Sequence, residues 1–305
     1  MIETPVLYIT FARPEYAIQS FAAIKKARPK KLYFYSNKAR NEKPDEETRN
    51  QEVRSYINQI DWDCDVKVWF RDEYVDVYTS LWGAIDWVFD NEKKAIIIEE
   101  DVVASLAFFD YIDKIIDKYE NNFKVWMISG NNATPQFNPD NLSYWGTRFI
   151  HIFGWASWAS RWKCLDRRME CWPTYRRSKE YNKYWGNRLV AKVQQLYYNK
   201  VFKNSSKYNP WDFIFSYNMV KNNSYCIVPK YNLVADVGLS GVHHKQKIKS
   251  IYQIEDNIPI TYEINHEPAL IAPTSYDRGH FYHYILKGLL KRKFLKLLNT
   301  FNINK

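Results

Sequence analysis

The first 130 residues alternate between short apolar runs and segments in which apolar residues recur at helical spacing. The apolar runs, rich in β-branched and aromatic residues, predict strands at 5–12, 31–36, 65–70, 94–102 and 124–130. The helical spacing predicts helices at 13–29, 78–91 and 104–121, and the polar segment 38–60 fits a loop with a surface helix. Strands that alternate with helices are joined by crossovers, so we expect an α/β fold with a mostly parallel sheet flanked by helices.

The alternation ends near residue 131. Residues 131–146 read as a loop, and residues 151–230 read as irregular structure with a few helices. No internal repeat or low-complexity linker divides the chain. We therefore expect a first half at 1–130, a second half at 131–270 of the same domain, and a tail at 271–305.

Composition narrows the class of protein. The chain has 305 residues, of which 46% are hydrophobic, and this predicts a globular protein with a sizeable core. Its formal net charge of +10 favours an anionic partner, which is a nucleic acid, a membrane face or a phosphorylated substrate. Four cysteines without a CxxC pair, no signal-peptide pattern and no membrane-spanning stretch lead us to expect a cytoplasmic protein.

The stretch "AIIIEEDVV" at 95–103 places three carboxylates at the end of an apolar strand. Ligands bind at the carboxyl ends of strands in open parallel sheets, and buried carboxylates need cations or hydrogen-bond donors. A divalent ion shared with substrate phosphates would satisfy them. Alternation along a strand would point Glu99 and Asp101 one way and Glu100 the other. The alternative is a solvated strand end or a first helical turn.

The segment from Ser80 to Asn132 resembles bacterial nucleotide-diphospho-sugar transferases of the haemolytic-protein-like type. It is also similar to the catalytic core of the N-acetylglucosaminyltransferase I family. Two later blocks, "FGWASWASRW" at 153–162 and the run at 211–244, match that pattern in order. The resemblance covers roughly residues 4–244, and four blocks in the right order are fairly specific.

This resemblance implies a fold of the GT-A type, a nucleotide-sugar donor, expected to be a UDP-sugar, and a divalent cation, Mn²⁺ or Mg²⁺. It makes 1–130 the donor-binding half and 131–270 the acceptor side. It implies that Asp101 binds the metal, while Glu99 and Glu100 contact the donor sugar and ribose. The other donor-binding positions that it implies are Thr10, Phe11, Arg13 and Ser36. The chain departs from the family pattern at Glu100, where Asp is usual, and at 74–76, which read Tyr-Val-Asp.

Transfer with inversion at the anomeric carbon needs a base for the acceptor hydroxyl and a cation for the departing diphosphate. The resemblance implies an Asp of a "WDDW" run as the base, and the matching "PWDF" run contains Asp212. The alternative role for Asp212 is a helix N-cap.

The remaining candidates lie in the Trp- and Gly-rich blocks. His243, which follows a Gly-rich run, is expected to complete the metal shell or contact the diphosphate, or else to be a surface residue. His151 is expected in the core. Trp155 and Trp158 either line the sugar pocket or pack in the core.

The tail is basic and amphipathic. No acid follows Asp277, and apolar residues recur at helical spacing among six basic ones: Lys287, Lys291, Arg292, Lys293, Lys296 and Lys305. This pattern favours an anionic membrane surface, and the alternative is a helix packed on the body of the protein.

We therefore expect a metal-dependent, inverting hexosyl- or N-acetylhexosaminyltransferase of polysaccharide biosynthesis. Its acceptor would be a glycan or lipid-linked glycan, at the inner face of the membrane, and no nucleic acid would bind. The alternatives are a metal-dependent nucleic-acid enzyme and an inactive sugar-binding protein.

Overall fold

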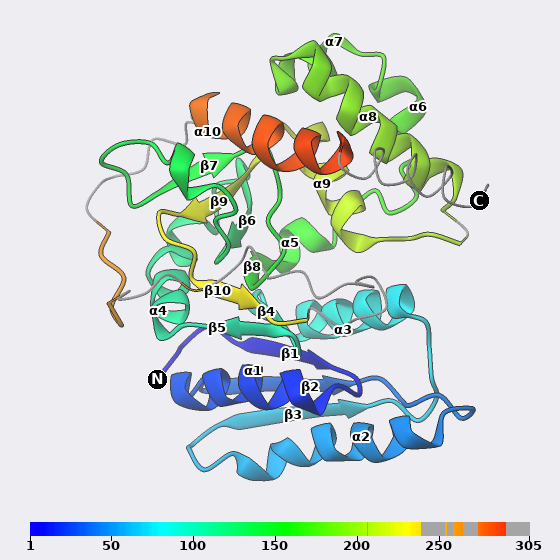
Figure 1. The fold of residues 1–305 in the computed structure, drawn as a ribbon, viewed down its shortest axis with the longest axis vertical. Coiled ribbons are helices and arrows are strands. Elements are labelled where there is room, and N and C mark those ends of the chain that lie inside the picture. The colour runs from blue at the N-terminus through cyan, green and yellow to red at the C-terminus, as the bar shows by residue number, and fades with distance from the viewer. Residues whose placement is uncertain (206, 239–253, 255–258, 265–273, 291–305) are drawn as a thin grey trace, which may run out of the picture.

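A computed structural model describes residues 1–205, 207–238, 254, 259–264 and 274–290 (Figure 1). At its centre is an eight-stranded sheet in the order β3-β2-β1-β4-β8-β6-β9-β7. The strands are β1 (Val6–Thr10), β2 (Lys31–Ser36), β3 (Asp65–Phe70), β4 (Lys94–Glu99), β6 (Val125–Ser129), β7 (Tyr144–Thr147), β8 (Trp155–Trp158) and β9 (Tyr225–Pro229). Within this sheet, β8 and β7 run against the other strands. The predicted α/β fold with a mostly parallel sheet flanked by helices is confirmed.

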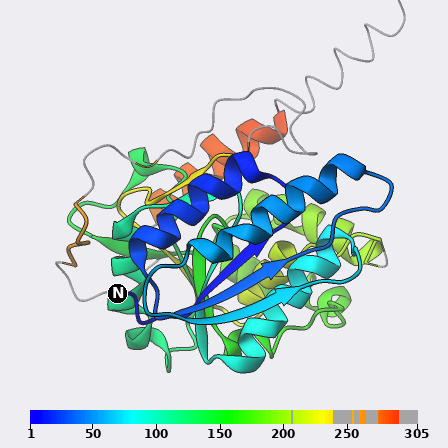
Figure 2. The ribbon, with the colours of Figure 1, turned by 90° about the horizontal axis from the view of Figure 1, so that it is seen from below.

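Helices cover both faces of the sheet (Figures 1 and 2). Along β1, Val6 and Tyr8 face one core, and Leu7 and Ile9 face the other. The first core includes side chains of α1 (Pro14–Ala27), α2 (Pro44–Ser55) and α4 (Leu106–Ile115). The second includes side chains of α3 (Val77–Asn91), α5 (Ala159–Trp162), α8 (Arg188–Lys203) and α9 (Trp211–Lys221). Burial on both faces explains why β1, β4 and β6 read as continuous apolar runs, whereas the edge strand β3 is largely exposed.

The chain turns directly after β4, which the sequence pattern did not predict. Residues 94–102 were expected as one strand, but β4 ends at Glu99 and a separate strand, β5 (Val102–Ala104), follows. β5 pairs antiparallel with β10 (Val234–Asp236) in a second, two-stranded sheet. This pairing brings the segment after β10 next to the turn at 100–101.

The second half contains more strands than expected, because β7, β8 and β9 are too short to show a period. Trp155 and Trp158 lie on β8 and are each 1% exposed. The Trp155 ring stacks on Trp211 with a centroid distance of 4.7 Å. These contacts favour the packing role for both tryptophans. His151 is buried, as expected for a core residue.

The C-terminal part of the described chain packs on this body. α10 (Thr274–Gly279) continues into the π-helical segment η4 (His280–Leu286), and both Tyr276 and Phe281 are fully buried. The smaller elements are η1 (Tyr56–Gln59), η2 (Asp117–Tyr119), η3 (Pro135–Phe137), α6 (Trp172–Tyr175) and α7 (Lys179–Trp185). Across the described ranges, no helix combines the length and apolar character that crossing a bilayer requires.

Candidate active site

The carboxyl ends of three parallel strands align at one edge of the sheet. In the pairing register Thr10 lies opposite Ser36, and Ile9 lies opposite Glu99. α1 begins at this edge with Pro14, a residue suited to the first helical position. The sequence therefore delivers the ends of β1, β2 and β4 to one place, as a ligand site of an open sheet requires.

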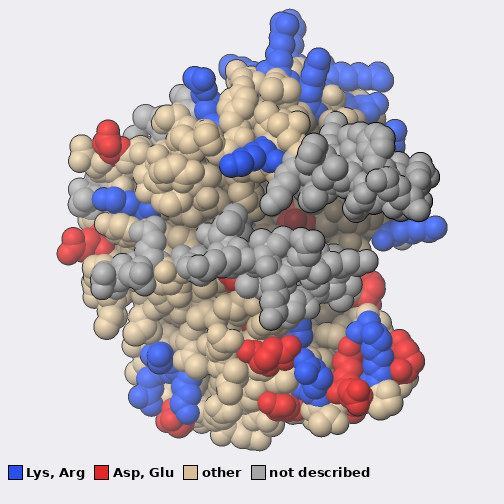
Figure 3. Space-filling model, in the orientation of Figure 1, with Lys and Arg blue, Asp and Glu red and all other residues tan. Residues whose placement is uncertain are grey.

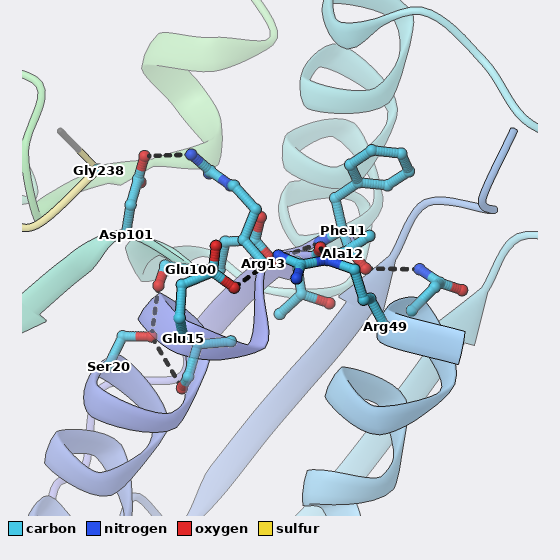
Figure 4. Close-up of polar contacts among 12 residues, drawn as sticks. Phe11, Ala12, Arg13, Glu15, Ser20, Arg49, Glu100, Asp101 and Gly238 are labelled. Atoms are coloured by element: carbon cyan, nitrogen blue, oxygen red, sulfur yellow. Dashed lines mark hydrogen bonds and ion pairs between the residues drawn. The ribbon is translucent and has the colours of Figure 1, made fainter. Parts of the chain in front are cut away.

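Glu100 lies at the centre of this edge and is 2% exposed. Its Oε2 accepts a hydrogen bond from the Phe11 backbone N–H at 2.7 Å, and its Oε1 accepts one from Arg13 Nε at 2.6 Å (Figure 4). Its backbone carbonyl accepts a hydrogen bond from Ser20 Oγ at 2.8 Å. Burial raises the pKa of Glu100, and the adjacent Arg13 opposes that rise. This carboxylate is thus a buried anchor for the loop after β1.

Asp101 shares the same arginine. Its Oδ2 is 3.0 Å from Arg13 Nη1, and a Cβ added to Gly238 would lie 2.5 Å from that oxygen (Figure 4). Only a glycine fits there without displacing the carboxylate. The expected alternation was wrong, because Glu100 and Asp101 lie in a turn and both contact Arg13.

Glu99 is half-buried, and its carboxylate forms no ion pair with a described residue, although the charge of Arg13 opposes the rise of its pKa. Burial, and next the negative charge of Asp101, raise the pKa of Glu99 to about 8. The charge of Asp212 contributes in the same direction. Asp212, predicted for the acceptor side, therefore lies close enough to Glu99 for its charge to influence the pKa of Glu99.

Asp212 reaches this edge from the first turn of α9. The N-cap position of α9 is Pro210, and no side chain caps the helix, so the N-cap alternative for Asp212 is wrong. Burial raises the pKa of Asp212 to about 6. The negative charge of Asp212 in turn helps to raise the pKa values of Tyr78 and Tyr208. A carboxylate with this pKa is ionised near neutral pH and is basic enough to accept a proton.

One tyrosine lies on α3 and the other in the segment before α9, and the charge of Asp212 acts on both. Tyr78 is in the first turn of α3, and its ring lies edge-on to Tyr208 with a centroid distance of 5.6 Å. Trp82 Nε1 donates to the Asn209 carbonyl at 3.0 Å and holds α3 against the segment before α9. Neither tyrosine was predicted, because residues 78 and 208 are 130 positions apart and no local pattern links them.

The side chains of Thr10 and Ser36 are closed inside the protein. Thr10 Oγ1 donates to the Tyr35 carbonyl at 2.9 Å, and Ser36 Oγ lies 3.2 Å from Arg54 Nε. Asn50 donates from Nδ2 to the Phe11 carbonyl at 2.5 Å. These contacts fix the strand ends, so Thr10 and Ser36 shape the edge rather than reach into it.

An aromatic pair flanks the loop after β1. The Phe11 ring lies 6.2 Å from that of Tyr74, which is 44% exposed. The adjoining loop is held by Asn37, whose Nδ2 donates to the Val75 carbonyl at 2.8 Å. Tyr74 belongs to the Tyr-Val-Asp segment at 74–76, which departs from the pattern of the family that the sequence resembles. Its position beside Phe11 was not predicted.

The residues present fit a divalent cation only if the substrate completes its shell. No group of three His, Cys, Asp or Glu side chains suited to a metal is found within the described ranges. Glu99 and Asp101 supply hard carboxylate oxygens whose mutual repulsion a cation would relieve. Mg²⁺ and similar ions are commonly held by one or two carboxylates together with substrate phosphates. His243, the other predicted ligand, lies outside the described residues.

Figure 3 shows Asp and Glu side chains mainly over the lower part of the molecule, where α2 lies. Lys and Arg side chains gather instead over α7 and α8, where Arg177, Lys183 and Arg188 are exposed (Figure 3).

No family model and no curated protein matches this chain. Solved structures show partial similarity. HddC from Yersinia pseudotuberculosis aligns over 53% of this chain and 80% of its own, with 9% identity and a TM-score of 0.30. The glycosyltransferase GlyE of Streptococcus pneumoniae TIGR4 aligns over 74% and 45%, with 10% identity and a TM-score of 0.32. A UDP-glucose pyrophosphorylase complexed with UDP-glucose aligns over 76% and 94%, with 7% identity and a TM-score of 0.36. Values this low show no family for the chain.

Proposed function

We propose that this protein is a metal-dependent glycosyltransferase that moves a hexosyl or N-acetylhexosaminyl group from a UDP-sugar to a glycan hydroxyl with inversion. The observation that carries the proposal is that the structure has two sets of carboxylates, one suited to bind the donor and its cation and one suited to act as the base. Glu99, Glu100 and Asp101 stand at the strand ends, and Asp212, with a pKa of about 6, approaches from a separate helix.

The donor lies along the carboxyl edge of the sheet in this proposal. Its base packs against Phe11 and the exposed ring of Tyr74, and its diphosphate lies by Arg13. Asp101, with Glu99 beside it, would hold the cation. A bound divalent cation would offset the negative charge on the departing diphosphate.

Asp212 accepts the proton of the attacking acceptor hydroxyl. Its raised pKa improves its strength as a base, and burial beside Tyr78 and Tyr208 limits access of water to it. With Asp212 as the single base and no covalent intermediate, transfer proceeds by direct displacement, which inverts the anomeric carbon.

The acceptor approaches from the second half of the chain. The exposed basic residues over α7 and α8, together with the basic tail, suit an anionic acceptor such as a lipid-linked glycan at a membrane surface. We propose this surface as the inner face of the membrane, in polysaccharide biosynthesis.

Calorimetry of nucleotide binding tests the proposal against its rivals. UDP should bind in the presence of Mn²⁺ more tightly than ADP, GDP or a short oligonucleotide. A nucleic-acid enzyme would bind the oligonucleotide with no preference for UDP. An inactive sugar-binding protein would bind sugars and leave every nucleotide-sugar intact.

A further inference from the structure

Arg13 contacts two carboxylates that differ in burial. Arg13 Nε is 2.6 Å from Glu100 Oε1, and Nη1 is 3.0 Å from Asp101 Oδ2 (Figure 4). The Glu100 side chain is 2% exposed, and that of Asp101 is 21% exposed. We propose that Arg13 is an exchangeable counter-ion, which holds Asp101 in the metal-free protein and releases it when a divalent cation and the donor diphosphate bind. This inference rests on the proposed function for the nature of the donor.

The ion pair between Arg13 and Glu100 is expected to persist when the cation and donor bind. Glu100 is buried and also accepts the Phe11 N–H, so removal of its arginine would leave a buried charge without its cation. The contact with Asp101 is partly exposed, so water and a cation can reach it more readily than the buried contact with Glu100. Rotation about the end of the side chain can therefore free Nη1 while Nε stays on Glu100.

Charge at the strand ends favours such an exchange. Glu99, Glu100 and Asp101 form a compact acidic group, and Arg13 is the cation within ion-pair distance of it among the residues that the structure describes. A dication added to this group competes with Arg13 for Asp101. Once displaced, the guanidinium Nη groups can donate to phosphate oxygens, the anion for which their fork geometry is suited.

If Arg13 exchanges partners in this way, Arg13→Gln should change the affinities for Mn²⁺ and for UDP in opposite directions. Without nucleotide, Arg13→Gln should raise the affinity for Mn²⁺ by about 10-fold, because a positive charge next to the ligand oxygen is removed. With saturating Mn²⁺, the same variant should bind UDP about 10- to 100-fold more weakly, because charge-assisted hydrogen bonds to phosphate are lost. A purely structural arginine would not produce a gain in Mn²⁺ affinity.

The experiment uses the full chain. Free Mn²⁺ is followed by its electron paramagnetic resonance signal, and UDP binding is measured by calorimetry. Arg13→Lys is the second variant, because an ammonium group can keep Glu100 paired but lacks the fork to hold Asp101 as well. It should show a smaller gain in Mn²⁺ affinity with an intact fold. Arg28→Gln is the matched control: Arg28 follows the opposite end of α1 and pairs with Asp61, and both affinities should stay unchanged.

Unchanged or weaker Mn²⁺ binding in both Arg13 variants would overturn the exchange. Equal UDP affinity with and without Mn²⁺ in the unmodified protein would also overturn it, since Arg13 would then serve as the permanent cation. Absence of UDP binding under all conditions would instead reject the proposed function, while the Mn²⁺ titrations would still decide whether Arg13 competes for Asp101.

Discussion

Replacing Asp212 with asparagine should separate catalysis from stability. If Asp212 is the base, Asp212→Asn should lower transfer by roughly 10²–10⁴-fold, the usual contribution of a positioned base. Binding of UDP and Mn²⁺ should remain, because those contacts lie at the ends of β1 and β4. The pKa of about 6 also predicts that transfer falls about tenfold per pH unit below pH 6, as the carboxylate becomes protonated.

The same substitution should not weaken the fold. Burial raises the pKa of Asp212 from 3.8 to about 6, which corresponds to an unfavourable contribution of about 3 kcal/mol to folding at neutral pH. Because the side chain is half-buried, solvent screening reduces this to about 1–2 kcal/mol. Loss of a negative charge in the first helical turn costs about 0.3–1 kcal/mol in the opposite direction. The free energy of unfolding at pH 7 should therefore stay equal or rise by about 1 kcal/mol.

The sign of the pH dependence follows from the raised pKa. Between pH 4 and pH 6 the folded protein binds this proton more tightly than the unfolded chain, so the contribution of Asp212 to stability falls as pH rises through that range. In Asp212→Asn, the free energy of unfolding should lack this decrease between pH 4 and pH 6. The other titratable groups nearby, Glu99, Tyr78 and Tyr208, are present in both proteins.

Three measurements on Asp212→Asn test whether Asp212 is the catalytic base: the transfer rate, urea unfolding at several pH values, and the affinity for UDP. Asp45→Asn is the control, because Asp45 is an exposed acid in the first turn of α2 and should affect none of them. Transfer per folded molecule that stays within a few-fold of the unmodified rate would refute the role of Asp212 as base.

Other changes probe the donor site and the tail. Asp101→Asn should abolish Mn²⁺-dependent UDP binding in calorimetry, since an amide is a poor ligand for a hard cation, whereas Asp90→Asn, in an exposed ion pair, should not; retained binding would exclude Asp101 as the ligand. Tyr74→Ala should weaken UDP binding about 10-fold through lost stacking while Tyr74→Phe keeps it, and equal losses would argue against stacking. Deleting 291–305 should leave a folded protein that no longer sediments with anionic liposomes, and continued sedimentation would place the membrane contact elsewhere.

The sequence predicted the parts of the site that follow from local pattern. The apolar run ending at Glu99 and the crossover helices were enough to place the acidic triplet at the carboxyl edge of a mostly parallel sheet. Asp212 was found only through the resemblance, and the structure then excluded its alternative as an N-cap.

Contacts between distant segments could not be predicted in the same way. Arg13 and Glu100 are 87 residues apart, and no period in the sequence links them. The pairing of β5 with β10 rests on three residues in each strand, too few for an alternation to appear, yet it brings Gly238 to Asp101. Tyr74 was missed because an aromatic residue in a loop has no distinguishing local pattern.

The most direct test of the central claim is proton NMR of the full chain incubated with Mn²⁺ and a panel of nucleotide-sugars. We predict slow release of UDP from one UDP-sugar, dependent on Mn²⁺ and absent in Asp101→Asn, with the freed sugar first appearing as the anomer opposite to that of the donor. Release of a sugar with retained configuration would contradict the single-displacement mechanism. Failure to cleave any nucleotide-sugar in the panel, with or without acceptor glycans, would contradict the assignment as a glycosyltransferase.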